Sequence, residues 1–253
     1  MLVAHISDTH IMAPKEPNER SLERINFFQR CVDDINSLRT IPDVVIHTGD
    51  LTDNGLPEEY IVAKDILKSL NVPFFLTPGN RDGSMSMMDS CAVDLNISKN
   101  HDSMVYAVNK FSIRLISVDT SSNRGPKGDL STKKLQKLKN LLNDYRDQPT
   151  LLFMHHPPFS ISLGERSYFE YDQPDSIRKF CNLIKNYKQV IGIFCGHIHR
   201  TYNTTLGNIE ANVMPSIALD LSQERITNKV DLPVYHLHKF YGGLRYETEI
   251  RNT

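Results

Sequence analysis

The stretch LVAHISDTH, residues 2–10, places a short apolar run directly before two polar side chains that can bind metals. The run Leu2–Ile6 predicts a buried strand, because it is brief, apolar and bounded by polar residues. Asp8 and His10 follow two positions apart, a spacing that can put both side chains on one face of an extended segment. We therefore expect a strand whose carboxyl end presents a carboxylate and an imidazole.

Helical and strand-like patterns alternate along the chain beyond this stretch. Helical spacing of apolar residues marks 21–38, 57–70, 131–142 and 174–187, and short apolar runs predict strands at 44–46, 74–76, 151–154 and 190–195. Residues 104–118 fit two further strands, and we expect Ser21 and Ser131 to cap their helices. After about residue 200 the pattern becomes strand-rich. This order predicts a layered α/β fold with largely parallel pairing in its first part.

The overall composition is that of an ordinary globular protein. The 253 residues fit one large domain or one domain with a small appendage. A formal net charge of −1 gives no bulk attraction to nucleic acid or to an acidic membrane, so we expect neither as a partner. No apolar segment approaches the roughly 20 residues that span a bilayer, and the start lacks the pattern of a signal peptide.

The cysteines indicate a reducing compartment. Cys31, Cys91, Cys181 and Cys195 lie far apart in the chain and form no CxxC pair. Such cysteines are typical of free thiols in intracellular proteins, so we expect a cytoplasmic location.

Ligand-type side chains follow each of the main predicted strands. They are Asp8 and His10 in SDTH, Asp50 in HTGDLTDNG, Asn80 in PGNRD, His155 and His156 in FMHHPPF, and His197 and His199 in FCGHIHR. Open α/β sheets place their sites at the carboxyl ends of the strands, so these side chains should converge in space.

The residue types suggest what converges there. Carboxylate oxygens and imidazole nitrogens suit Mn, Fe, Co and Zn, and without thiolates a closed structural zinc site is not expected. We count seven ligands: Asp8, His10, Asp50, Asn80, His155, His197 and His199. If Asp50 bridges, each of two divalent cations receives four protein groups and keeps room for water. With a bridging hydroxide the charge is about +1, which suits a two-metal hydrolytic site acting on phosphate.

The motifs D-x-H, GD, GN-x-D, H and GH-x-H, in this order over about residues 1–200, resemble those of the calcineurin-like metallophosphoesterases. LVAHISDTH, GDLTDNGLPEEY and FMHHPPF are most similar to the bacterial branch that contains glycerophosphodiesterase and the cyclic-nucleotide (cAMP) phosphodiesterases. The resemblance implies a four-layer α-β-β-α sandwich with a strand-rich C-terminal tail. Residues 1–200 would form the catalytic core, and residues 201–253 would complete the sandwich.

The resemblance also implies how the ligands divide and what the tail does. Asp8, His10, Asp50 and His199 would hold one metal, and Asp50, Asn80, His155 and His197 the other. His155 rather than His156 is the ligand in this branch, which leaves His156 a supporting or packing role. Relatives use the tail to cover the site and to form dimers, so we expect a homodimer or larger oligomer, with LPVYHLHKF (232–240) as a pairing edge.

Arginine stands where most members of the resembled family have histidine, directly after Asn80. Arg81 stays charged at ordinary pH, so it cannot act as a general acid, but its planar fork can clamp phosphate oxygens. We expect Arg81 to stabilise transition-state charge and Asp82 to orient it through a salt bridge.

Four further histidines lie outside the ligand set. His5 and His47 lie inside strands one layer below the ligands, where we expect an orienting or packing role. His236 and His238 repeat the two-residue spacing of a ligand pair but fall outside the motif order. We interpret them as ordinary members of a tail strand.

These features together predict a binuclear metal-dependent phosphodiesterase. A metal-bridging hydroxide would attack a small phosphodiester, either a glycerophosphodiester or a cyclic nucleotide. One alternative is a phosphomonoesterase or nucleotide pyrophosphatase that uses the same metals, and a diester-to-monoester rate ratio would separate it. Another is a catalytically weak scaffold or binding protein of the same fold, which would show no metal-dependent turnover.

Overall fold

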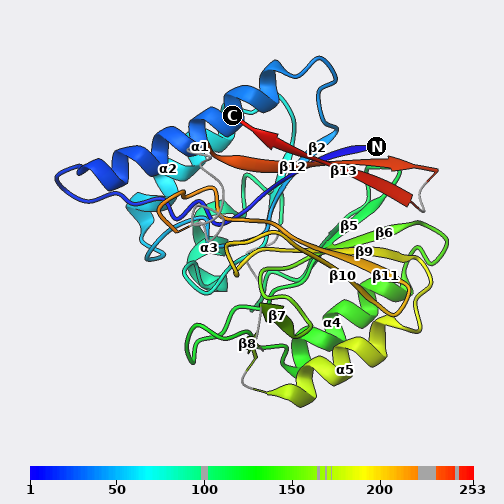
Figure 1. The fold of residues 1–253 in the computed structure, drawn as a ribbon. Coiled ribbons are helices and arrows are strands. Elements are labelled where there is room, and N and C mark those ends of the chain that lie inside the picture. Colours follow the sequence, from blue (N-terminus) through cyan, green and yellow to red (C-terminus); the bar gives the residue numbers. More distant parts are fainter. Residues whose placement is uncertain (98–101, 164–165, 169, 172, 222–231, 243–244) are drawn as a thin grey trace.

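The computed structural model describes residues 1–97, 102–163, 166–168, 170–171, 173–221, 232–242 and 245–253. At its centre two β-sheets pack face to face, and helices cover their outer faces (Figure 1). The layers follow the order helix, sheet, sheet, helix. This confirms the predicted α/β sandwich.

The first sheet combines the start of the chain with its end. Its strands are β1 (Leu2–Ile6), β2 (Val44–His47), β3 (Phe74–Leu76), β12 (Val234–Tyr241) and β13 (Arg245–Asn252). They lie in the order β13-β12-β1-β2-β3. The pairs β1–β2 and β2–β3 are parallel, whereas β12 runs antiparallel to both β1 and β13.

The second sheet is built mainly from the middle of the chain. Its strands are β4 (Tyr106–Val108), β5 (Arg114–Ser117), β6 (Thr150–Phe153), β9 (Val190–Cys195), β10 (Tyr202–Leu206) and β11 (Ile209–Val213). Their order is β10-β11-β9-β6-β5-β4, with parallel pairing from β11 through β9 and β6 to β5. A separate hairpin joins β7 (Ile161–Leu163) to β8 (Arg166–Tyr168).

Two sets of helices cover the sheets. The helices α1 (Glu19–Ser37) and α2 (Pro57–Lys68) pack on the first sheet, with α3 (Ser84–Cys91) beside α2. The helices α4 (Thr132–Asn143) and α5 (Pro174–Ile184) pack on the second sheet. Each buries an apolar stripe, such as Phe28, Val32 and Ile35 of α1, which is the pattern expected of amphipathic helices on a sheet.

The helix starts agree only in part with the sequence-based expectation. Ser131 caps α4 by accepting a hydrogen bond from the backbone amide of Lys134, as predicted. Helix α1, however, begins before Ser21, because the Asn18 side chain accepts from the Ser21 backbone amide. Ser21 instead completes a capping box, in which its hydroxyl accepts from the Asn18 amide.

The tail contributes to both sheets. Strands β10 and β11 extend the second sheet, whereas β12 and β13 extend the first. The expectation that residues 232–240 form a pairing edge is wrong, because β12 lies between β1 and β13 and its backbone is paired on both sides. Within the described part of the chain, no helix has the length and apolar character needed to cross a bilayer.

Candidate metal centre

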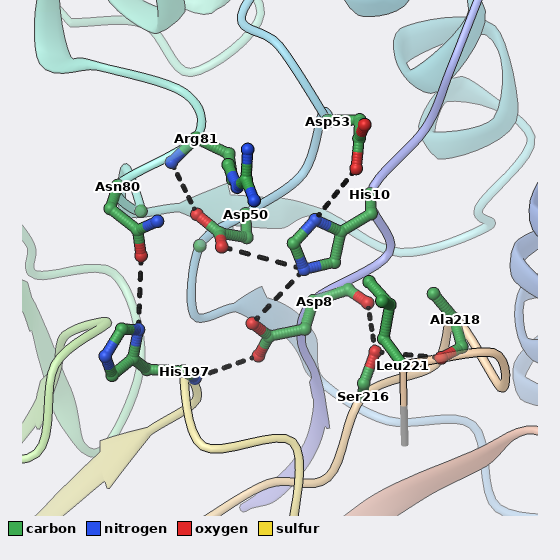
Figure 2. A network of polar contacts seen from close by, with 12 residues as sticks. Asp8, His10, Asp50, Asp53, Asn80, Arg81, His197, Ser216, Ala218 and Leu221 are labelled. Atoms are coloured by element: carbon green, nitrogen blue, oxygen red, sulfur yellow. Dashed lines mark hydrogen bonds and ion pairs between the residues drawn. The ribbon is translucent and has the colours of Figure 1, made fainter. Parts of the chain in front are cut away.

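The loops that carry the seven predicted ligands meet at one rim of the two sheets. Asp8 and His10 follow β1, Asp50 follows β2, and Asn80 follows β3. From the second sheet, His155 follows β6, and His197 and His199 follow β9. Figure 2 shows Asp8, His10, Asp50, Asn80 and His197 directed toward a common space.

Three side chains form the first group of closely spaced donor atoms. His10 Nε2 lies 3.2 Å from His199 Nε2 and 3.7 Å from Asp8 Oδ1. His199 Nε2 is in turn 3.2 Å from Asp8 Oδ1. Two nitrogens about 2.1 Å from a tetrahedral zinc ion are about 3.4 Å apart, so the group has the spacing of ligands on one cation.

Three other side chains form a second group. Asn80 Oδ1 is 3.1 Å from both His155 Nε2 and His197 Nδ1, and these two nitrogens are 3.2 Å apart. The Nδ1 atom of His155 faces the backbone carbonyl of Thr48 at 2.8 Å, so that ring turns its Nε2 toward the group. The second group therefore also has ligand spacing.

Asp50 lies between the two groups. Its Oδ2 is 3.6 Å from His10 Nε2, and its Oδ1 is 3.5 Å from His155 Nε2. The backbone amide of Arg81 donates to the same Oδ1 at 2.8 Å and fixes the carboxylate (Figure 2). One carboxylate that presents an oxygen to each group has the placement of a bridging ligand.

The buried carboxylates support the fit to cations. Asp8 is fully buried, and its Oδ1 has no hydrogen bond among the described residues. Its close contacts are with His199 Nε2 and His10 Nε2, at 3.2 Å and 3.7 Å. Because a buried carboxylate oxygen needs a strong partner, a cation at the first group would satisfy it. Asp, Asn and His donors without thiolate also match divalent first-row ions. The residues present therefore fit the metals that the sequence predicts.

The electrostatics of the site also favour cations. Burial alone would lower the pKa of His10, but Asp53, Asp8 and Asp50 outweigh it and raise that pKa to about 9. Burial likewise opposes the charged form of His155, yet Asp50 raises its pKa to about 9. The carboxylates thus hold protons on the neighbouring imidazoles, and bound cations would displace those protons.

The backbone is strained where the ligands lie. Five of the seven candidate ligands have positive φ: Asp8 (54°), His10 (46°), Asp50 (51°), His197 (76°) and His199 (53°). Such conformations cost about 1–3 kcal/mol each in residues other than glycine, and they concentrate at functional sites. The strain marks this rim independently of the residue types.

The glycine of the PGN turn permits the approach of Asp50. A Cβ added at Gly79 would lie 2.1 Å from Asp50 Oδ1 and 2.3 Å from the Asp50 backbone nitrogen. The backbone atom cannot move aside without shifting the loop after β2. The glycine in this motif is therefore a steric requirement of the metal centre.

Gly79→Ala should lower the free energy of unfolding by about 2–3 kcal/mol, the cost of overpacking a tight contact. It should also reduce the metal content, because Asp50 is displaced. Urea unfolding and elemental analysis measure the two effects. Gly207→Ala is the matched control, with φ +67° and open space around the added Cβ, and it should cost about 1 kcal/mol. Equal behaviour of the two variants would refute the steric argument.

Arg81 and Asp82 differ in exposure and in the groups that they contact. Arg81 is exposed, and its side chain extends beside Asp50 toward His10 (Figure 2). Asp82 is buried; its Oδ2 accepts from the amides of Leu51 and Gly79, and its Oδ1 from the amide and hydroxyl of Thr52. The expected Arg81–Asp82 salt bridge does not form in the described structure, because Asp82 instead ties together the loops after β2 and β3.

His156 is enclosed beside the second group. Its Nδ1 lies 2.8 Å from Thr120 Oγ1, and its Nε2 lies 2.9 Å from the Pro126 carbonyl, to which it donates. Its ring centroid is 4.3 Å from that of His197 and 4.9 Å from that of His155. With both nitrogens engaged, His156 is not available as a ligand. A supporting or packing role for His156 stays our prediction.

Sequence patterns did not identify two supports of the ligands. Arg24 is buried and donates to the His10 carbonyl (2.9 Å) and to Asp53 (2.8 Å), whose Oδ1 lies 3.5 Å from His10 Nδ1. Glu170 Oε2 lies 3.3 Å from His197 Nε2. Carboxylates that hold the outer nitrogen of a ligating histidine orient its ring. The sequence held one indication of this support, which is that Arg24 lies on the otherwise apolar face of α1.

Comparison with known proteins gives a consistent set of relatives. A family model described as calcineurin-like phosphoesterase matches residues 1–201. A probable glycerophosphodiester phosphodiesterase, GpdQ, of Arcobacter nitrofigilis is 35% identical over 88% of this chain and 82% of its own length. GpdQ of Enterobacter lignolyticus is 30% identical, with 85% and 77% covered. A 3′,5′-cyclic-nucleotide phosphodiesterase of Nostoc is 26% identical, with 98% and 91% covered.

Solved structures share the fold. A dimetal phosphatase from Danio rerio superposes with a TM-score of 0.70 over 98% of both chains, at 12% sequence identity. At this level of identity the likeness concerns the arrangement of sheets and helices.

Proposed function

The chain belongs to the calcineurin-like phosphoesterase family, and on that premise we propose that it hydrolyses a small phosphodiester with two divalent cations at the candidate metal centre. The observation that carries the proposal is the placement of Asp50, with one carboxylate oxygen toward each group of donor atoms. Membership of the family and the names of the relatives make the protein a phosphodiester hydrolase.

The two cations would be held by overlapping sets of side chains. Asp8, His10, Asp50 and His199 would hold one, and Asp50, Asn80, His155 and His197 the other. The ligand-like spacing of both groups supports this division, as does the buried Asp8 Oδ1, which accepts no hydrogen bond among the described residues. Bound there, Mn, Fe, Co or Zn would neutralise phosphoryl oxygens and lower the pKa of a water to supply the nucleophile at neutral pH.

The protein's own groups would position the reacting partners. Asp53 and Arg24 hold the His10 ring, and Glu170 holds the outer nitrogen of His197. Asp82 fixes the backbone directly after Asp50 and directly before Asn80. Arg81 would bind a phosphate oxygen from the open side of the site. Rigid support of this kind keeps the ligands in productive geometry.

A glycerophosphodiester is our preferred substrate class. The two relatives named for that activity are 35% and 30% identical to this chain, whereas the cyclic-nucleotide phosphodiesterase of Nostoc is 26% identical.

We place the protein in the cytoplasm, a proposal supported by its four free cysteines, which all lie within the described residues. A homodimer or larger assembly also stays a proposal, and light scattering at micromolar concentration would test it.

Reloading the chelator-treated protein with Mn, Fe, Co or Zn should restore turnover of a bis-aryl phosphodiester. An aryl leaving group departs without a proton, so the assay does not depend on a general acid. Asn80→Ala removes one donor of the second group and should abolish most of the restored activity. A folded protein without turnover under any metal would favour a binding role.

The substrate class is tested in the same preparation. Turnover of a glycerophosphodiester should exceed that of a 3′,5′-cyclic nucleotide and that of an aryl phosphomonoester. A higher rate on the monoester would contradict the proposed diesterase activity.

A further inference from the structure

Three buried histidines lie together behind the metal centre, where they take no part in the proposed reaction. His5 is on β1, and His236 and His238 are on the neighbouring strand β12. All three are fully buried, and they offer nitrogen atoms that lie within 4.8 Å of one another. The sequence suggested an orienting or packing role for His5 and an ordinary place in a tail strand for His236 and His238, but their hydrogen bonds suggest another role.

A relay of hydrogen bonds from Asp8 determines where the proton of His5 lies. Ser7 Oγ donates to Asp8 Oδ2 at 2.5 Å, and Thr48 Oγ1 donates to Ser7 Oγ at 2.7 Å. Since the Thr48 hydroxyl hydrogen is used, its oxygen accepts from His5 Nε2, 2.9 Å away. His5 therefore carries its proton on Nε2. Its Nδ1 is bare and lies 3.4 Å from His238 Nε2.

His236 has a bare nitrogen of its own. Its Nδ1 lies 3.0 Å from Asn212 Oδ1, and because a carbonyl oxygen accepts, Nδ1 carries the proton. Its Nε2 then carries a lone pair in place of a proton. This nitrogen is buried and has no hydrogen-bond partner among the described residues. Leaving such a nitrogen unpaired in a protein interior is costly.

His238 can present a third bare nitrogen to the same place. Its Nδ1 lies 2.9 Å from Thr248 Oγ1, and a hydroxyl oxygen can accept a proton from it. A bound cation would replace the hydrogen bond between His238 Nε2 and His5 Nδ1, with the proton of His238 held on Nδ1. Thr48, Asn212 and Thr248 would each fix the tautomer of one imidazole, as hydrogen-bond partners of metal-bound histidines do.

We propose that His5 Nδ1, His236 Nε2 and His238 Nε2 bind a further divalent cation, separate from the catalytic centre. Two imidazole nitrogens on a tetrahedral zinc ion are about 3.4 Å apart, and His5 Nδ1 and His238 Nε2 are separated by 3.4 Å. Three neutral imidazoles select zinc, copper, nickel or cobalt over magnesium and calcium. The ion would crosslink β1 to β12.

A cavity lies beside the hydrogen-bond partners of two of these histidines. It has a volume of about 350 Å³, and its lining includes Asn212 and Thr248, the hydrogen-bond partners of His236 and His238. Glu210, an exposed carboxylate, lines the same cavity and would attract cations. Phe194 closes another side of the cluster, with its ring centroid 4.0 Å from that of His238.

The stoichiometry of bound zinc tests the proposal. Wild-type protein dialysed against zinc should hold three equivalents per chain, and His236→Asn should hold two. Asparagine can place its amide NH₂ near the former Nδ1 and still donate to Asn212, so the substitution removes mainly the Nε2 ligand. Equal values in both proteins would overturn the proposal. The difference between the proteins does not depend on how fully the catalytic centre is loaded.

A second variant covers the case in which His236→Asn does not fold. Thr248 is exposed on β13, so Thr248→Val should leave the fold intact while it removes the partner of His238 Nδ1. The affinity for the third zinc equivalent should then fall about 10- to 100-fold. An unchanged affinity would count against the histidine cluster as the site. Retention of the third equivalent in Asp50→Asn would show that it is distinct from the catalytic metals.

Discussion

Asp50→Asn should lower phosphodiester turnover by about 10³-fold or more while the protein stays folded, since a catalytic metal centre provides several kcal/mol of charge stabilisation. Asp50 presents Oδ1 toward His155 and Oδ2 toward His10. An asparagine can offer one oxygen only, and its NH₂ would face the second cation with hydrogens. The substitution should therefore also reduce the metal bound to the centre.

Asp50→Asn separates the effect of losing the negative charge from any effect of backbone strain. Asp50 has φ 51°, and asparagine is among the residues that tolerate this left-handed conformation best. The measurements are kcat on a bis-aryl phosphodiester and metal content after dialysis. Asp53→Asn is the matched control, because Asp53 faces His10 at Nδ1, the ring nitrogen that is not a donor atom of the first group, and otherwise pairs with the guanidinium of Arg24. We expect a loss of about 10- to 100-fold there. An Asp50→Asn enzyme that keeps a tenth of its activity would exclude a bridging role.

The convergence of the ligands could be predicted because it follows from topology. Asp8, Asp50 and Asn80 each follow a parallel strand of the first sheet, and the carboxyl ends of such strands meet at one rim. The glycine before Asn80 follows from the same topology, because a side chain there would collide with Asp50 on the neighbouring loop. Motif order and strand order together were sufficient to predict that these side chains lie close together.

The supporting contacts could not be predicted, because they depend on loop geometry that no local pattern encodes. Asp82 follows Arg81 directly, which suggested an ion pair, yet four donors from Leu51, Thr52 and Gly79 surround its carboxylate. Glu170 reaches His197 from a distant loop.

The tail shows a related limit of sequence reasoning. An apolar strand pattern indicates burial, but it does not say which neighbours provide that burial. The run 232–240 suggested an exposed pairing edge, and β12 is in fact an inner strand. The same placement brings His236 and His238 beside His5.

Arg81→Ala should lower turnover by about 10²–10³-fold, the usual loss when a group that stabilises transition-state charge is removed. The guanidinium is exposed, extends beside Asp50, and has no ion pair or hydrogen bond with another described side chain, so it is free to bind a phosphate oxygen. Because that oxygen gains charge whatever alcohol departs, aryl and alkyl diesters should slow by similar factors.

The series Arg81→Lys, Arg81→His and Arg81→Ala tests the assignment. Lysine keeps the positive charge but loses the planar fork, so its rate should lie between those of arginine and alanine. Histidine is charged only at low pH, so its rate should fall as the pH rises past about 6.5 on both substrates. A loss confined to the alkyl diester would instead place the side chain at the leaving oxygen. Unchanged rates in Arg81→Ala would remove Arg81 from the reaction altogether. Only parallel losses, graded by charge, are consistent with a clamp on the phosphoryl group.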